Sequence, residues 1–77
     1  MKYQSKKLIV LEANIDDMNP EWYEPLMEIL FKAGALDVTL RPVMMKKSRP
    51  GTLTSVLCSP TQRDKFLKIL FEESTTL

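Results

Sequence analysis

Two neighbouring carboxylates, those of Asp16 and Asp17, are the first adjacent acidic pair along the chain and could hold a metal ion. They lie between an apolar run typical of a strand and an amphipathic run typical of a helix. In a loop of this kind both carboxylates can face one cation, whereas adjacent side chains on a strand point to opposite faces of the sheet. We therefore consider Asp16 and Asp17 as metal ligands, with helix capping and solubility as the plainer interpretation.

A basic segment at residues 45–51, Met-Lys-Lys-Ser-Arg-Pro-Gly, is the second candidate for chemistry. Its cationic side chains suit phosphate oxygens, because an arginine can bind them through two parallel hydrogen bonds and a lysine acts as a point charge. Pro-Gly is also a turn signal, so the end of this segment could simply close a hairpin. The candidate phosphate-binding residues are Lys46, Lys47, Arg49 and Gly51.

Three apolar or alternating segments predict the strands that carry these residues. Residues 8–14 are apolar on both faces in their first half, which favours a central position or a covered face. Residues 35–44 alternate, which predicts a half-buried strand. Pro42 places that strand at an edge of the sheet, because proline cannot donate a hydrogen bond to a neighbouring strand. Residues 52–58, rich in Thr, Val and Leu, form the third predicted strand.

The first predicted helix follows the start signal Asn19-Pro20 and ends just before Gly34. Pro25 interrupts its pattern, because a proline inside a helix removes one backbone hydrogen bond. We therefore expect a short turn from Pro20, and then either a kink or a helix proper that begins near Glu24.

The second predicted helix begins with a capping box at Ser59 to Gln62, in which the serine hydroxyl bonds a backbone N–H of the first turn. It continues to about Glu73, and residues 74–77 are typical of the start of an extended segment. The side chains expected in its buried stripe are Phe66, Leu67, Leu70 and Phe71.

The order strand, helix, strand, strand, helix matches the first five of the six elements in the ferredoxin-like split β-α-β fold. The expected fold class is therefore α+β, with a single domain over residues 1–77 whose last strand is missing or only begun. A helical crossover makes the first two strands parallel. The acidic loop after the first strand and the basic hairpin between the second and third would then emerge at the same end of the sheet.

This end of the sheet, where the acidic loop and the basic hairpin would meet, is called the rim below. It suits a divalent cation bound to a nucleotide or a polyphosphate. A hard cation takes one or two protein carboxylates and completes its shell with water and phosphate oxygens. The N-terminus of the first helix would add N–H donors for the phosphates. The alternative is that the two loops only pair with each other, since an exposed ion pair contributes about 0 to 1 kcal/mol and needs no further purpose.

The composition argues against several other classes of function. A net charge of +1 gives no general attraction to nucleic acid or to an anionic membrane. No apolar run approaches the roughly 18 residues of a transmembrane helix. The single cysteine, Cys58, excludes an internal disulfide and suits the cytoplasm, and the chain has no histidine to activate it as a nucleophile. Without imidazole ligands, the chain cannot by itself build a tight nickel or zinc cage.

Four segments together resemble one protein family. They are Leu-Glu-Ala-Asn-Ile-Asp-Asp-Met-Asn-Pro-Glu at 11–21, Ala-Gly-Ala-Leu-Asp-Val at 33–38, Met-Lys-Lys-Ser-Arg-Pro-Gly-Thr-Leu at 45–53 and Glu-Glu-Ser-Thr-Thr-Leu at 72–77. In this order they resemble the C-terminal domain of the nickel-pincer-cofactor nickel insertion proteins. The resemblance covers nearly the whole chain after the first several residues.

The resemblance implies a CTP-dependent nickel chelatase, of the lyase class, that loads nickel into a pyridinium bis-thiocarboxylic acid mononucleotide, the cofactor precursor of lactate racemase. It also implies that the C-terminal domain holds the metal-bound nucleotide. By this resemblance Asp16 and Asp17 would help to hold Mn²⁺ or Mg²⁺, and Lys46, Lys47 and Arg49 would contact the triphosphate of CTP.

Members of that family are much longer, so we expect this chain to be a fragment without complete chelatase activity. A first strand that lacks its fourth-strand neighbour has an unpaired edge, which favours association between copies, and we therefore expect a homo-oligomer. A structural or oligomerisation module without a ligand of its own is the alternative function, and a small regulatory binding domain is a third by fold analogy alone.

Overall fold

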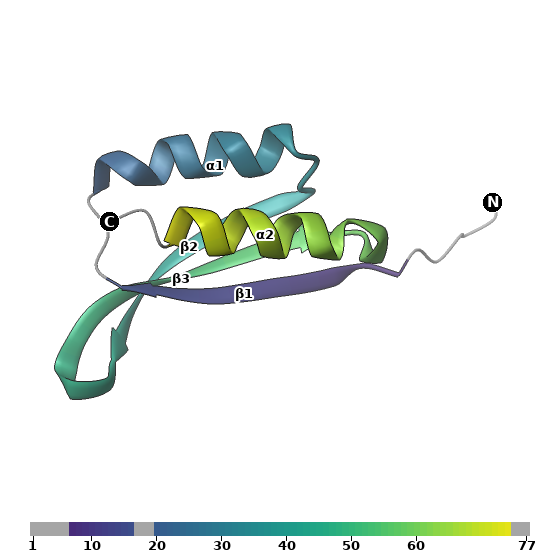
Figure 1. The fold of residues 1–77 in the computed structure, drawn as a ribbon. Coiled ribbons are helices and arrows are strands. Elements are labelled where there is room, and N and C mark those ends of the chain that lie inside the picture. The colour runs from purple at the N-terminus through teal and green to yellow at the C-terminus, as the bar shows by residue number, and fades with distance from the viewer. Residues whose placement is uncertain (1–6, 17–19, 75–77) are drawn as a thin grey trace, which may run out of the picture.

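The computed structural model of the chain describes residues 7–16 and 20–74, and these form two helices packed on one face of a sheet (Figure 1). The sheet contains β1 (Ile9–Asp16), β2 (Asp37–Met45) and β3 (Arg49–Cys58) in the order β1-β3-β2. β3 pairs antiparallel with both neighbours, so β1 and β2 run in the same direction. The predicted α+β class and the order of the first five ferredoxin-like elements are confirmed.

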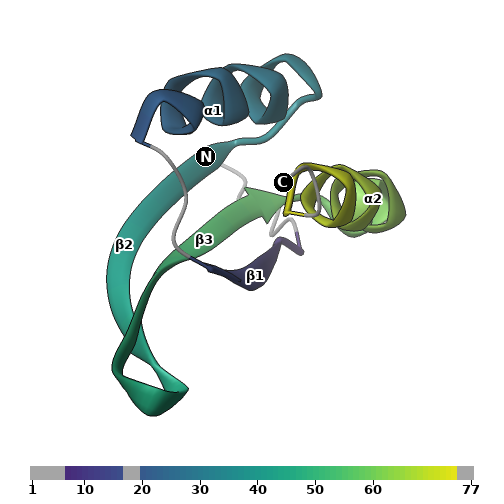
Figure 2. The same cartoon turned by 60° about the vertical axis from the view of Figure 1, so that its left-hand side comes forward.

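The helices α1 (Tyr23–Lys32) and α2 (Arg63–Ser74) lie side by side over the sheet, α1 above β2 and α2 above β1 (Figures 1 and 2). Their inward side chains meet those of the strands in one core. The buried apolar residues are Ile15, Leu26, Leu30, Val38, Val56, Cys58, Phe66 and Leu70. The other face of the sheet carries no helix, and no helix in the described part of the chain has the length and apolar character to cross a membrane.

The first helix begins as its prolines require. A single 3-10 turn, η1 (Pro20–Trp22), precedes α1, and Pro25 lies in the first turn of α1, where its missing N–H has no helical partner. The helix ends at Lys32, and Gly34, just after its C-cap Ala33, has a φ of +108°, the left-handed conformation that glycine adopts without strain. The N–H of Ala35 then donates to the carbonyl oxygen of Leu30 at 3.1 Å. The expected short turn and the expected helix end are both confirmed.

The second helix differs from expectation at its start and along its flank. Ser59 precedes the turn η3 (Pro60–Gln62), and its hydroxyl bonds the side chain of Gln62 at 3.3 Å instead of a backbone N–H. Leu67 and Phe71, expected in the buried stripe, are 41% and 69% exposed. They lie on the flank of α2, where the described chain provides no further element to cover them.

The strand positions also correct one expectation and confirm another. β2 lies at an edge of the sheet, as Pro42 predicts. β1 lies at the opposite edge of the sheet, and Val10 is 57% exposed on the face without helices. The apolar sequence of this strand favoured a central position or a covered face, and neither is found among the described strands. The fourth strand would start beyond Ser74, at residues outside the described part of the chain.

Candidate functional site

The basic segment forms a tight turn at the tip of a hairpin between β2 and β3. The turn η2 (Lys46–Ser48) places both Lys47 and Ser48 at positive φ, 62° and 59°, and the N–H of Arg49 donates to the carbonyl oxygen of Lys46. Two consecutive positive φ angles define a type I′ turn, which suits the twist of a hairpin. The turn leaves the lysines 46 and 47 exposed at the tip.

The expected turn at Pro50-Gly51 is wrong, because both residues belong to β3. Gly51 pairs with Val43 on one side and with Asp16 on the other. A Cβ atom at Gly51 would run into the side chain of Met45 and come within 3.0 Å of the carbonyl oxygen of Ile15. The glycine is therefore required by close packing of the strands, and its contact with a phosphate stays a prediction.

The acidic end of β1 and the basic hairpin meet, as the predicted chain direction requires. Asp16 is the last residue of β1, and its Oδ1 lies 3.5 Å from Nη2 of Arg49. Both side chains are largely exposed, at 56% and 61%. Such a pair contributes at most about 1 kcal/mol, so a ligand can separate the two charges at little cost. Asp17, the second candidate metal ligand, lies outside the described residues.

A hydrogen bond ties the start of α1 to the same end of the sheet. The hydroxyl groups of Tyr23, the first residue of α1, and Thr52 of β3 are 2.7 Å apart. Thr52 pairs with Ile15, the residue before Asp16. The bond therefore holds the beginning of the first helix beside the rim, and no pattern in the sequence indicates it, because the two residues are 29 positions apart.

The donor set at the rim fits a hard cation better than a soft or borderline one. The described residues contain no cluster of three or more Asp, Glu, Cys and His side chains. Cys58 is fully buried on the helix-covered face, and burial raises the pKa of its thiol. Mg²⁺ or Mn²⁺ can share the Asp16 carboxylate with water and phosphate oxygens, whereas nickel favours imidazole and thiolate ligands, which the described residues of the rim do not provide.

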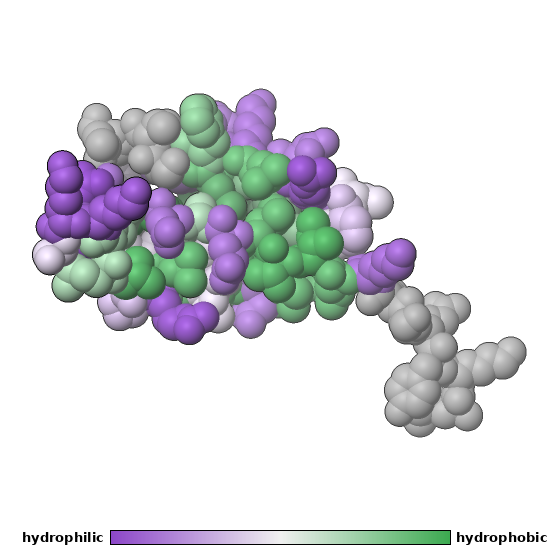
Figure 3. Space-filling view, turned by 90° about the horizontal axis from the view of Figure 1, so that it is seen from below, coloured by the Kyte–Doolittle hydropathy of each residue, from purple (hydrophilic) through white to green (hydrophobic). Residues whose placement is uncertain are grey.

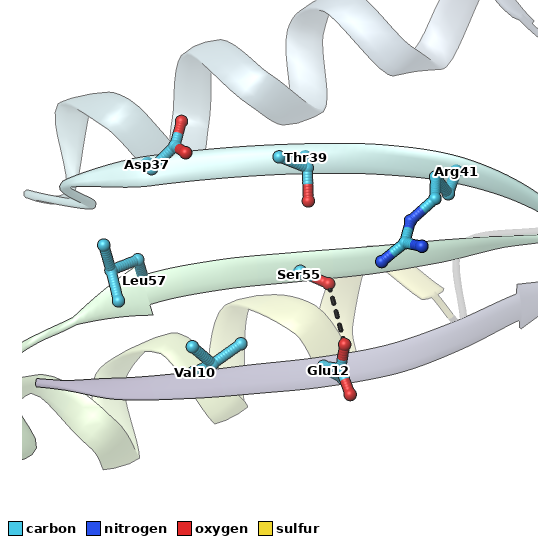
Figure 4. A pocket seen from close by; sticks show the side chains of 7 residues that line it. All are labelled: Val10, Glu12, Asp37, Thr39, Arg41, Ser55 and Leu57. Atoms are coloured by element: carbon cyan, nitrogen blue, oxygen red, sulfur yellow. Dashed lines mark hydrogen bonds between the residues drawn. The ribbon is translucent and has the colours of Figure 1, made fainter.

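A second group of polar side chains lies on the face of the sheet that no helix covers, called the open face below. The group is further from the rim along the strands. Glu12 has the same side-chain direction as Asp16, and Arg41 comes from the opposite edge strand. The hydroxyl of Ser55 donates to Oε2 of Glu12 at 3.1 Å (Figure 4). The alternation of β2 and the antiparallel register together place these residues on one face, a signal that the loop motifs do not contain.

Comparisons with known proteins place this geometry in a family. A family model described as nickel insertion protein matches residues 1–77. The chain belongs to the nickel insertion protein family. It is 51% identical over 74 residues to the pyridinium-3,5-bisthiocarboxylic acid mononucleotide nickel insertion protein of Thermotoga petrophila, which covers 96% of this chain and 19% of that protein. It is 55% identical over 69 residues to a putative nickel insertion protein of Dictyoglomus thermophilum, covering 90% of this chain and 18% of that protein.

A solved structure of the family shares the fold. It is LarC2, the C-terminal domain of a cyclometallase involved in the synthesis of the NPN cofactor of lactate racemase, in its apo form. The TM-score is 0.82 at 38% sequence identity, and the match covers 91% of this chain and 49% of that chain. The chain therefore spans about a fifth of the curated relatives and about half of this domain.

Proposed function

We propose that this chain is a metal–nucleotide-binding module of a nickel insertion protein, and that it holds CTP with Mg²⁺ or Mn²⁺ at the rim where Asp16 and Arg49 meet. The observation that carries the proposal is the 3.5 Å approach of these two oppositely charged, exposed side chains. Lys46 and Lys47, exposed at the tip of the same hairpin, add positive charge next to Arg49.

The two opposite charges at the rim could each bind one part of such a ligand, the cation or the phosphates. The carboxylate of Asp16 would face the divalent cation, which keeps water and phosphate oxygens in its remaining positions. The guanidinium of Arg49 would turn to the phosphate oxygens, which it can bind with two hydrogen bonds. The existing contact is longer than the 2.7–2.9 Å of a close charge-assisted hydrogen bond, so it opposes this exchange weakly.

Nickel is the cargo of the whole protein in this proposal, and the pyridinium mononucleotide named for the relatives is its acceptor. The described part of this chain offers neither an exposed thiol nor an imidazole for nickel. The chelatase reaction therefore needs other parts of the longer protein, and the chain alone binds the metal–nucleotide without turning it over. We place the protein in the cytoplasm, where CTP is available and a free cysteine stays reduced.

Titration calorimetry of the 77-residue chain with Mg–CTP tests the proposal. Arg49→Ala is expected to weaken binding about tenfold, since a hydrogen bond to a charged group contributes about 1.5 kcal/mol. Asp16→Asn is expected to weaken binding by at least as much, because it removes the negative charge that faces the cation. Asp64→Asn and Arg63→Ala on α2 are the matched controls, because both residues are exposed on the other side of the molecule. The proposal is wrong if the controls weaken binding as much as the rim variants do.

A second candidate function is oligomerisation, and a specific observation favours it. The outer edge of β1 has no strand partner among the described residues. Exposed apolar side chains lie on both sides of this edge, Leu8 and Val10 on the open face and Leu67 and Phe71 on α2. Such an edge can pair with another copy of the chain. Sedimentation velocity is expected to show a dimer or larger species that Val10→Lys reduces, and a monomer at all concentrations would contradict it.

A further inference from the structure

The end of β1 and the start of the first helix are joined by a short connection at the rim. β1 ends at Asp16 and the turn η1 begins at Pro20, so three residues of the sequence lie between them. Because an extended chain advances at most about 3.6 Å per residue, this connection spans no more than about 14 Å. Any interaction that fixes the start of α1 therefore also limits how far Asp16 can move.

Asp16 needs such support, because its own contacts are weak. It is the last residue of a strand at an edge of the described sheet, and strand ends of this kind open readily. Its ion pair with Arg49 is exposed to water on both sides, which screens the attraction between the charges. Figure 3 shows the open face, where hydrophilic side chains gather on the left, at the end of the molecule with the hairpin. These surface charges do not by themselves keep one carboxylate in a fixed position.

A buried hydrogen bond supplies the support from the helix-covered side of the sheet. The hydroxyl groups of Tyr23 and Thr52 are 2.7 Å apart, and Thr52 is only 5% exposed. A hydrogen bond shielded from water is stronger than an exposed one, and breaking it leaves a buried polar group unpaired. Thr52 pairs with Ile15, the residue directly before Asp16. The bond therefore anchors the start of α1 at the strand position next to the carboxylate.

We propose that Tyr23 is a positioning residue for the metal site, and that its bond to Thr52 holds the Asp16 carboxylate where a divalent cation meets it. The inference rests on the proposed function, because it needs Asp16 to be a metal ligand. Ile15 is buried in the core, so its neighbour Asp16 points to the opposite face of the sheet from Tyr23. Tyr23 therefore acts through Asp16 and does not itself contact the ligand.

The positive charges of the rim are held independently of this bond. Lys46, Lys47 and Arg49 belong to the hairpin, whose strands β2 and β3 pair with each other as far as its turn. Loss of the Tyr23 hydroxyl should therefore weaken the contribution of the metal and leave the contacts with phosphate oxygens in place. A variant that is only less stable would not lose one of these two contributions selectively.

The test measures the affinity of the 77-residue chain for inorganic triphosphate by titration calorimetry, with and without Mg²⁺. The quantity of interest is the ratio of the two affinities, which isolates the contribution of the metal. Tyr23→Phe and Thr52→Val are each expected to lower this ratio about fivefold, because binding must then fix a chain segment that the parent chain already holds. Thr52→Ser keeps a hydroxyl group and should retain the ratio of the parent chain.

Two further variants separate positioning from stability. Tyr23→Phe alone leaves the buried hydroxyl of Thr52 unpaired, so it is expected to lower the urea midpoint of unfolding. The double variant Tyr23→Phe/Thr52→Val removes both hydroxyl groups, so most of the stability should return while the ratio stays low. Ser59→Ala is the matched control, because it removes a hydrogen bond between side chains before α2, at the opposite end of β3 from the rim. It should leave the ratio unchanged.

A thermodynamic cycle shows whether Tyr23 acts through Asp16. In a chain that carries Asp16→Asn, the further change Tyr23→Phe is expected to leave the ratio as it is, because the carboxylate that Tyr23 positions is already gone. A further fall of about fivefold in this background would overturn the inference.

The remaining outcomes separate the inference from the proposed function. If Asp16→Asn lowers the ratio and Tyr23→Phe does not, the inference is overturned and the metal site stands. It is also overturned if Ser59→Ala lowers the ratio as much as Tyr23→Phe does, or if the double variant restores the ratio together with the stability. If Asp16→Asn leaves the ratio unchanged, Asp16 does not hold the metal, and the proposed function and the inference fail together.

Discussion

At Gly51 the strands approach so closely that a side chain has no room. A Cβ atom there would meet the side chain of Met45 and the backbone oxygen of Ile15. We predict that Gly51→Ala lowers the free energy of unfolding by about 1 to 3 kcal/mol, the usual cost of an overpacked position. Urea unfolding measures the loss, and Met45→Ala in the same chain is expected to restore part of it. Equal stability of Gly51→Ala and the parent chain would contradict this packing.

Cys58 carries a pH dependence that follows from its burial. Burial raises the pKa of its thiol in the folded chain above the ordinary value near 9.0, which the unfolded chain retains. As pH rises above about 9, the unfolded chain loses the thiol proton first, so the free energy of unfolding falls. Denaturant titrations between about pH 8 and 10 should show this decrease, and Cys58→Ala should reduce it. Identical profiles for the two chains would show that Cys58 ionises as readily in the folded state.

At the scale of elements, the hairpin between β2 and β3 determines where the positive charges lie. Its turn requires positive φ at Lys47 and Ser48, a conformation in which residues other than glycine and asparagine are strained. Strain of this kind is often found at functional sites. Here it presents Lys47 at the tip of the hairpin, next to the residues proposed to hold phosphate.

Ser48→Gly tests the strain in this turn. Glycine adopts positive φ without a steric penalty, so we expect the variant to be more stable by about 0.5 kcal/mol, after the larger chain entropy of glycine in the unfolded state. Thermal or urea unfolding measures the difference. Ser55→Gly on β3 is the control and should be destabilised, because its strand conformation does not require glycine. A loss of stability in Ser48→Gly would mean that the turn is not strained at this residue.

The elements also show how far the sequence could predict this structure. The two prolines at 20 and 25 and the glycine at 34 determine where α1 begins and ends, and local rules for these residues are strong. The turn at 46–48 was missed because its residues do not prefer positive φ, whereas Pro50-Gly51 is a common turn pair. Here the register of the two strands overrides the local preference.

Burial was harder to predict than position. The periodicity of α2 gives four apolar residues on one side, but only Phe66 and Leu70 of these face the core. A helix pattern shows which residues share a face and cannot show how wide a surface the neighbouring elements cover. Chain direction alone predicted that Asp16 would meet the basic hairpin. A shallow depression on the open face, lined by residues of all three strands, could not be predicted in this way, because it depends on the register of these strands.

At the scale of the whole molecule, the two helices cover one face of the sheet, and no helix of the described residues covers the other (Figure 2). The core lies between the helices and the sheet, so variants on the open face alter few buried contacts. The proposed metal–nucleotide site lies at the rim, outside this core. This separation allows the charges at the site to be changed while the fold is retained.

Paramagnetic line broadening by Mn²⁺ in the presence of CTP is the measurement that tests the central claim most directly. The metal broadens only the amide signals that lie near it. The account predicts that signals of residues 14–16 and 46–51 broaden first, and that Asp16→Asn reduces the effect. Broadening that is absent with Mn–CTP in excess, or that is strongest along α2, would contradict it.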